Sequence, residues 1–244
     1  KYGCYNKSEC ICIKGNIMRL TSYFTRFEII LWIVSVVTIS VSALIFGPID
    51  ILVLIASLVG TTFLILNAKG NVWGQILTVV FSIMYGVISY NKAYYGEMIT
   101  YLGMTAPIAM ASIITWIKNP SDNGKNEVEV NHLKKVEYIF LFFLSCGVTS
   151  VFFFILRALD TPALIFSTLS VFTSFVASYL TMRRCEFFAL AYASNDLVLI
   201  ILWIIATLQN KSYISVVVCF VIFLINDLYG FFSWQQMKKN QAKK

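Results

Sequence analysis

Eight apolar segments dominate the sequence and leave few folds open to it. Each has the roughly 17–25 residues that an α-helix needs to cross about 30 Å of hydrocarbon. The segments cover residues 27–46, 51–67, 73–90, 98–117, 136–156, 162–182, 187–208 and 214–233. Hydrophobic residues make up 59% of the chain and charged residues 13%, a balance that excludes a soluble domain. We therefore predict an all-α integral membrane protein with eight transmembrane helices.

The basic residues predict the orientation of these helices. Of the nineteen Lys and Arg residues, sixteen lie on one side of the expected spans, and only Lys92, Arg157 and Lys211 lie on the other. Loops rich in Lys and Arg face the cytoplasm, so both termini are expected there, in a multi-pass protein of the cell inner (plasma) membrane. The charges are scattered over short loops and tails. This argues against a nucleic-acid partner, which needs a continuous basic face.

The sequence offers little for enzymatic chemistry. Its only histidine, His132, lies in a hydrophilic loop, so no Ser-His-Asp, Cys-His or zinc-protease set can be assembled. Cys4, Cys10 and Cys12 crowd the amino terminus in a spacing that fits no common zinc site. No phosphate-binding loop of the P-loop type is present, and no cleavable signal peptide precedes the first span. We expect no cofactor, no metal and no enzymatic activity; an intramembrane enzyme and a purely structural protein remain as remote alternatives.

An internal repeat predicts how the helices are grouped. Tyr94 precedes Trp116 by 22 residues and Tyr213 precedes Trp234 by 21, in each case across one span that follows an "NK" turn. Spans 2–4 and 6–8 therefore resemble two copies of a three-helix unit in the same orientation, although a Trp at a membrane interface is common in any case. The expected organisation is an N-terminal segment (1–26), an extra helix (27–47), a first bundle (51–117), a loop (118–135), a linker helix (136–158), a second bundle (161–234) and a basic tail (235–244).

Two Asn-Asp pairs lie inside apolar spans, Asn195-Asp196 and Asn226-Asp227. A carboxylate at the centre of a membrane helix costs about 2.5–3.5 kcal/mol on insertion scales, so these pairs need a reason. We interpret both amides as substrate contacts; the alternative is a hydrogen bond between helices. The two carboxyl groups can be protonated, face a neighbouring helix, or attract a cationic substrate, and the sequence leaves these readings open.

Aromatic and hydroxyl side chains complete the predicted binding site. Phe188, Tyr192 and Asn195 share one face of a helix, where two rings flank an amide and could hold a flat heterocycle. Tyr229 lies within one turn of Asn226, and Tyr85 and Thr105 add hydroxyl groups at comparable depth. Because aromatic residues make up 16% of the chain, simple packing is the alternative for each ring.

Several motifs resemble the PnuC family of vitamin transporters. They are "AKGN" (68–71), "YGVISY" (85–90), "YGE" (95–97) with Pro107 and Trp116, "MRR" with Glu186, then Asn195 and "LINDLYGFFSW" (224–234). The resemblance implies a fold similar to the sugar-transporting SWEET proteins, two three-helix bundles joined by a linker helix. It also implies facilitated uptake of nicotinamide riboside by alternating access, with trapping by a cytosolic kinase. Thiamine, riboflavin or a deoxynucleoside are alternative substrates, and a homo-oligomer is left open.

The resemblance is incomplete at the expected site residues. In the family pattern a Trp-x-x-x-Asn sequence in the seventh span contacts the substrate; Asn195 matches the Asn, but Ala191 replaces the Trp. Phe188 stands where another Trp is frequent, while Asn226 matches well. Asp196 and Asp227 do not belong to the pattern, and we favour a cationic ligand that they could attract over a neutral one.

Overall fold

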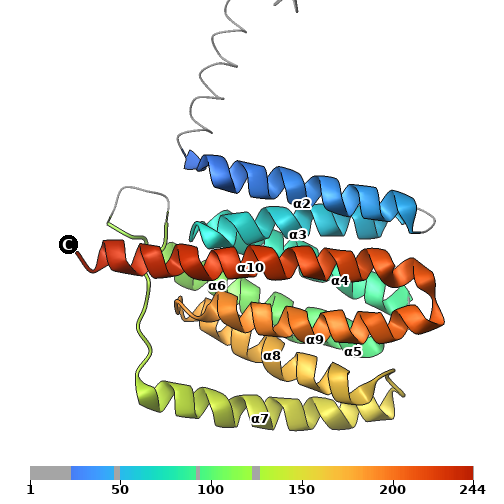
Figure 1. Cartoon of the computed structure of the whole chain (residues 1–244). Helices are drawn as coiled ribbons and strands as arrows, with labels where there is room; N and C mark the ends of the chain where they lie inside the picture. Colours follow the sequence, from blue (N-terminus) through green and yellow to red (C-terminus); the bar gives the residue numbers. More distant parts are fainter. Residues whose placement is uncertain (1–22, 47–49, 92–93, 123–126, 244) are drawn as a thin grey trace, which may run out of the picture.

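The structure is a computed structural model that describes residues 23–46, 50–91, 94–122 and 127–243. Within these ranges eight helical segments are long and apolar enough to cross a membrane, which confirms the predicted all-α membrane fold. They run side by side along a common axis (Figure 1). The amino-terminal cysteines Cys4, Cys10 and Cys12 lie outside the described residues.

The helices begin and end close to the limits predicted from hydropathy. In chain order they are α2 (Arg26–Ile45), α3 (Ile51–Ala68), α4 (Val72–Asn91), α5 (Tyr95–Thr100), η1 (Tyr101–Thr105), α6 (Ala106–Lys118), α7 (Lys135–Ala158), α8 (Leu164–Met182), α9 (Phe188–Gln209), η2 (Lys211–Tyr213) and α10 (Ile214–Gln241). The elements α5, η1 and α6 follow one another without a break and form a single span, Tyr95–Lys118.

Six spans form a closed ring. Helices α3, α4 and α6 pack consecutively on one side, and α8, α9 and α10 do so on the other. Contacts of α3 with α10 and of α6 with α8 close the ring between the two groups. Helix α2 packs outside it against α3 and α10, and α7 packs outside it against α8, so these two helices lie at opposite edges of the molecule (Figure 1).

Two buried tryptophans connect the groups in a reciprocal way. Trp116, near the end of α6, donates its indole N–H to the carbonyl of Thr181 in α8 at 2.9 Å. Trp234 of α10 donates in the same way to the carbonyl of Asn67 in α3 at 2.8 Å. The two rings also meet, with centroids 5.6 Å apart. Each three-helix group therefore binds the other through the same residue type at the same helix end, as an internal repeat would produce.

Helix α10 is longer than the sequence indicated, because it continues through the expected basic tail as far as Gln241. Contacts with other segments hold this extension in place. Lys238 donates to Glu186 at 2.6 Å, and Gln241 accepts from the backbone N–H of Val130 at 2.8 Å. The loop that joins α6 to α7 is thereby fixed across one end of the bundle, which we call the basic end because it carries Lys69, Arg183, Arg184 and Lys238.

Span Tyr95–Lys118 contains a π-helix at its centre, in the five residues of η1. The N–H of Ala106 bonds to the carbonyl of Tyr101, five residues earlier in the chain, whereas in an α-helix the acceptor is four residues earlier. Pro107 follows directly and has no N–H to donate, so the turn before it loses a regular hydrogen bond and widens. Wider turns of this kind occur frequently at functional sites.

Candidate substrate cavity

A small cavity lies inside the six-helix ring. Its lining comes from α3, α4, span Tyr95–Lys118, α8, α9 and α10, and comprises Phe63, Leu64, Asn67, Thr78, Phe81, Ser82, Tyr101, Thr105, Ser174, Phe188, Tyr192, Asn195, Asp196, Phe220, Phe223 and Asp227. The space open to the centres of water molecules is about 40 Å³, enough for a few waters. Pockets that hold small molecules usually have about 300–1,000 Å³. The cavity is therefore contracted in this conformation.

Asn195 is the predicted amide that does reach the cavity. Its Oδ1 accepts hydrogen bonds from Thr173 Oγ1 at 2.8 Å and from Ser174 Oγ at 2.9 Å, both in α8. These bonds fix the orientation of the side chain. Both hydrogen bonds that this side chain makes with the described residues are accepted by Oδ1, and none is donated by Nδ2. The amide N–H group is therefore available to a ligand carbonyl or hydroxyl.

Asp196 and Asp227 both line the cavity, one from α9 and one from α10, and their carboxyl groups interact directly. Both residues are buried. Asp196 Oδ2 has no hydrogen-bond partner in the described part of the chain. No Lys, Arg or His is among the lining residues, so these two acids have no basic counterpart in the lining.

Aromatic side chains form one wall of the cavity. Phe188 and Tyr192 of α9 meet edge to face with ring centroids 6.3 Å apart, and the Tyr192 hydroxyl lies 3.2 Å from Ser178 Oγ. Tyr101 enters from η1, and Thr105 reaches the same cavity one turn later. These rings present flat faces beside the Asn195 amide, the combination expected for a heterocycle that carries polar groups.

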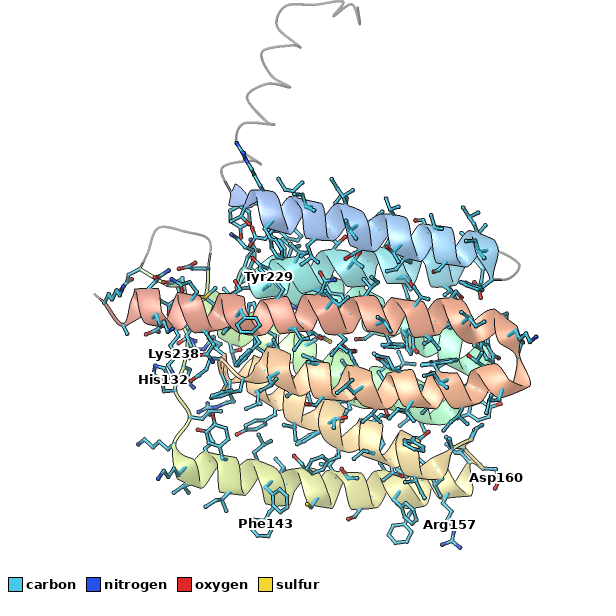
Figure 2. The ribbon with its side chains drawn as sticks, in the orientation of Figure 1. His132, Phe143, Arg157, Asp160, Tyr229 and Lys238 are labelled. Atoms are coloured by element: carbon cyan, nitrogen blue, oxygen red, sulfur yellow. The ribbon has the colours of Figure 1, made fainter. Side chains whose placement is uncertain are left out.

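Two predicted site residues lie elsewhere. Asn226 is not among the cavity-lining residues; its Nδ2 donates to Ser35 Oγ of α2 at 3.0 Å and to the Ile222 carbonyl. The Tyr229 hydroxyl donates to Glu28 Oε1 of α2 at 2.7 Å (Figure 2). Both residues therefore attach the extra helix α2 to the ring, an interhelical role. Since successive residues turn by about 100° around a helix, Asp227 faces the cavity where Asn226 does not.

Tyr85 lines a second, smaller cavity farther from the basic end. This outer cavity is mainly apolar and is bounded by Val53, Ala56, Ser57, Ile88, Trp203, Val216 and Cys219 in addition to Tyr85. Phe81, Phe220 and Phe223 line both cavities and so separate them. Tyr85 contacts this partition from the outer side, stacked on Phe81 at 5.5 Å between ring centroids.

Several lining residues were not singled out by the sequence. At the basic end, Asn67 Oδ1 accepts from Gln75 Nε2 at 2.9 Å and Asn67 Nδ2 donates to Thr78 Oγ1 at 3.3 Å. The signal for this network was present, because Asn67, Gln75 and Thr78 are polar residues at the joined ends of two apolar spans. Phe63 and Phe220 gave no such signal, since they look like any other apolar residue of a membrane helix.

The Glu186 carboxylate at the basic end is paired outside the cavity. Glu186 is held by Lys238 at 2.6 Å and by His132 Nδ1 at 3.6 Å. Burial raises the pKa of the Glu186 carboxyl, but the hydrogen bond and positive charge of Lys238 outweigh this effect and leave the pKa below its ordinary value. Figure 2 shows His132 and Lys238 at this end, with Arg157 and Asp160 at the opposite end.

Comparisons with known proteins agree with this architecture. A family model described as nicotinamide mononucleotide transporter matches residues 50–236. A protein of Neisseria mucosa named nicotinamide riboside transporter PnuC is 25% identical over 224 residues, which is 90% of this chain and 84% of the relative. A protein of the same name from Haemophilus influenzae is 21% identical over 214 residues, 87% of this chain and 91% of the relative.

A solved structure, the crystal structure of the vitamin B3 transporter PnuC, has the same fold. It superposes with a TM-score of 0.77 and 22% identity, and the match covers 89% of this chain and 94% of that one. These relatives are named as transporters, which supports a transporter of small molecules over a membrane enzyme. Because the family model covers residues 50–236, more than half of the sequence, the chain belongs to the PnuC family of nicotinamide mononucleotide transporters.

Proposed function

We propose that this protein carries nicotinamide riboside across the cell inner (plasma) membrane by facilitated diffusion. Family membership and the names of its relatives support this substrate. The basic end, which carries most of the Lys and Arg residues, is assigned to the cytoplasm by the positive-inside rule. A cytosolic kinase that phosphorylates the product would then trap it inside the cell.

The cavity between the two helix groups carries this proposal. It brings together the Asn195 amide N–H without a protein acceptor, the aromatic faces of Phe188 and Tyr192, and the hydroxyl of Thr105. We assign the carboxamide or ribose oxygens of the substrate to the amide, and its flat ring to the aromatic faces. The burial of these groups excludes water, so the polar contacts determine which ligand fits.

The small volume of the cavity supports transport by alternating access. A nucleoside does not fit into the present space, so one helix group must move relative to the other, and the two faces must open in turn. The sequence contains no phosphate-binding loop of the P-loop type that could use ATP. We therefore propose passive, bidirectional movement down the gradient of the substrate.

Counterflow in proteoliposomes tests this function. Vesicles loaded with unlabelled nicotinamide riboside should accumulate the labelled compound transiently without a pH gradient or membrane potential. Empty liposomes and liposomes with denatured protein serve as controls. Loss of exchange on adding a protonophore, with the substrate gradient held fixed, would show coupling to protons and refute the passive reading.

Other vitamins of the same transport class are the second candidate. Ala191 and Phe188 stand where the family pattern has Trp, so stacking on the substrate ring is weaker than that pattern provides. The same vesicles should therefore be tested with thiamine, riboflavin and a deoxynucleoside. Exchange of one of these, with none of nicotinamide riboside, would reassign the substrate while leaving the transport mechanism intact.

A further inference from the structure

Two acidic residues line the central cavity without a basic counterpart. Asp196 and Asp227 enter it from neighbouring helices, and the lining residues include no basic side chain. The other titratable groups that act on this pair are Tyr101 of η1, Tyr192 of α9 and Cys219 of α10, none of which supplies a positive charge.

Three of the four basic residues that define the basic end pair with other acids; the fourth, Arg184, does not line the cavity. At the basic end, Lys69 pairs with Glu28 at 3.3 Å, Arg183 pairs with Glu137, and Lys238 pairs with Glu186 at 2.6 Å. Each of these pairs lies outside the cavity. The carboxyl pair inside the ring therefore has no partner of opposite charge within the described protein.

One buried polar atom of the cavity lacks a partner, and a second polar group beside it donates no hydrogen bond to the described residues. Asp196 Oδ2 has no hydrogen-bond partner among the described residues although only 4% of the residue is exposed. The adjacent Asn195 also lines the cavity and has a free amide N–H group. Buried polar atoms are satisfied in most proteins, so unpartnered ones that line a cavity indicate a missing ligand. The Asp196 carboxyl and the Asn195 amide together match a ligand that carries a positive charge close to a hydrogen-bond acceptor.

We propose that Asp196 and Asp227 form the subsite for the positive charge of the substrate, so that this protein selects a flat aromatic cation over an uncharged ring of the same shape. The inference rests on the proposed function and deepens it. Nicotinamide riboside meets the requirement, because its pyridinium ring carries a permanent positive charge. The aromatic faces of Phe188 and Tyr192 attract the same cation, more weakly than Trp would.

Two ligands of the same shape that differ in charge test the inference on the whole chain. Calorimetric titration of the purified protein in nanodiscs would compare nicotinamide riboside with benzamide riboside, in which a neutral benzene carbon replaces the pyridinium nitrogen. The pyridinium nitrogen has no N–H to donate, so its attraction to a carboxylate is electrostatic, and the cation should bind about ten- to a hundredfold more tightly. Equal affinities would overturn the inference while leaving the proposed function intact.

Substitutions identify the groups responsible. Asp196→Asn and Asp227→Asn keep the shape of each side chain and remove its charge, and each should lower the affinity for nicotinamide riboside about tenfold or more. Binding of benzamide riboside should change less than threefold in the same variants, which also shows that they are folded. Asp160→Asn is the matched control, because Asp160 is exposed in the turn between α7 and α8, and at φ 48° it has a backbone conformation that Asn tolerates.

Each remaining outcome has a defined meaning. Wild-type protein that binds neither riboside would contradict the proposed function and the inference with it. Equal loss of both ligands in the Asp→Asn variants would show that the carboxyl groups shape the cavity and do not recognise charge. If an Asp→Asn variant fails to fold, the comparison of the two ligands on wild-type protein still decides the question.

Discussion

Replacement of Trp116 or Trp234 by Phe should destabilise the protein by similar amounts. Each substitution removes one indole N–H bond to a carbonyl of the opposite helix group, at 2.9 Å for Trp116 and 2.8 Å for Trp234. A buried acceptor left without any partner costs about 1–3 kcal/mol. Here each carbonyl keeps a backbone partner, since Arg184 donates to Thr181 and Gly70 donates to Asn67, each at 2.9 Å. The loss should therefore lie near the lower limit, at about 1–2 kcal/mol for each variant.

Thermal unfolding in detergent measures this effect. For a chain of this size 1–2 kcal/mol corresponds to a fall in Tm of about 2–8 °C. The two rings touch, with centroids 5.6 Å apart, so the double variant should depart from additivity by about 0.5 kcal/mol or more. Trp73→Phe is the matched control, because 64% of Trp73 is exposed, and its Tm should stay within about 1 °C of wild type.

The reciprocal arrangement makes this prediction easy to refute. If only one of the two substitutions lowers the Tm, the two indole hydrogen bonds do not stabilise the protein equally. The internal repeat would then not extend to the stability of the contacts between the helix groups. If Trp73→Phe lowers the Tm as much as either buried variant, the effect belongs to loss of indole rings in general.

Three further substitutions follow from the structure. Asn195→Leu should lower substrate affinity about 5- to 150-fold. Asn226→Leu should instead lower the Tm with little change in affinity, because Asn226 bonds to α2. Calorimetry and thermal unfolding of both variants separate the two roles. Gly60→Ala should destabilise the ring, since its Cβ would lie 2.2 Å from the Phe223 ring, and should also weaken binding by pushing that ring into the cavity. Glu186→Gln should lower the Tm at pH 7. The pKa of Glu186 lies below its ordinary value, so its ionised form stabilises the fold at neutral pH, and this stabilisation disappears as the pH falls through that pKa. The difference in Tm between the variant and wild type should therefore shrink in acid.

Membrane thickness explains why the helix limits could be predicted so closely. A span must be apolar over a fixed length, so hydropathy alone places α3 at residues 51–67, and the observed helix is Ile51–Ala68. The continuation of α10 to Gln241 was not predictable in this way, because its sequence is polar. It depends on Glu186 and the loop around Val130, partners that only the folded chain brings together.

The direction in which a side chain points was harder to predict than its depth in the membrane. Asn226 and Asp227 lie at the same depth, and hydropathy treats both as polar residues in an apolar helix. Which one faces the cavity depends on where α2 and α9 pack around α10, and that position is set by contacts far apart in the sequence. Asn195 was predicted to share one helix face with Phe188 and Tyr192, and all three residues line the central cavity.

The aromatic partition links the small cavity to the proposed transport. Phe81, Phe220 and Phe223 separate the central cavity from the outer one, with Phe223 5.8 Å from Phe81 and 5.7 Å from Phe220 between ring centroids. Each such pair is worth about 0.5–1.5 kcal/mol beyond burial, so separating the rings costs about 1–3 kcal/mol.

A ligand can shift the equilibrium between the closed and opened partition only through contacts that it makes in the opened state. A flat cationic ring supplies such contacts, because it can stack on the freed phenyl faces while its charge stays beside Asp196 and Asp227. A neutral ligand of the same shape keeps the stacking and loses the charge contact. The charge preference inferred for the cavity should therefore extend to the rate of exchange, and counterflow of benzamide riboside should be slower than that of nicotinamide riboside at equal occupancy.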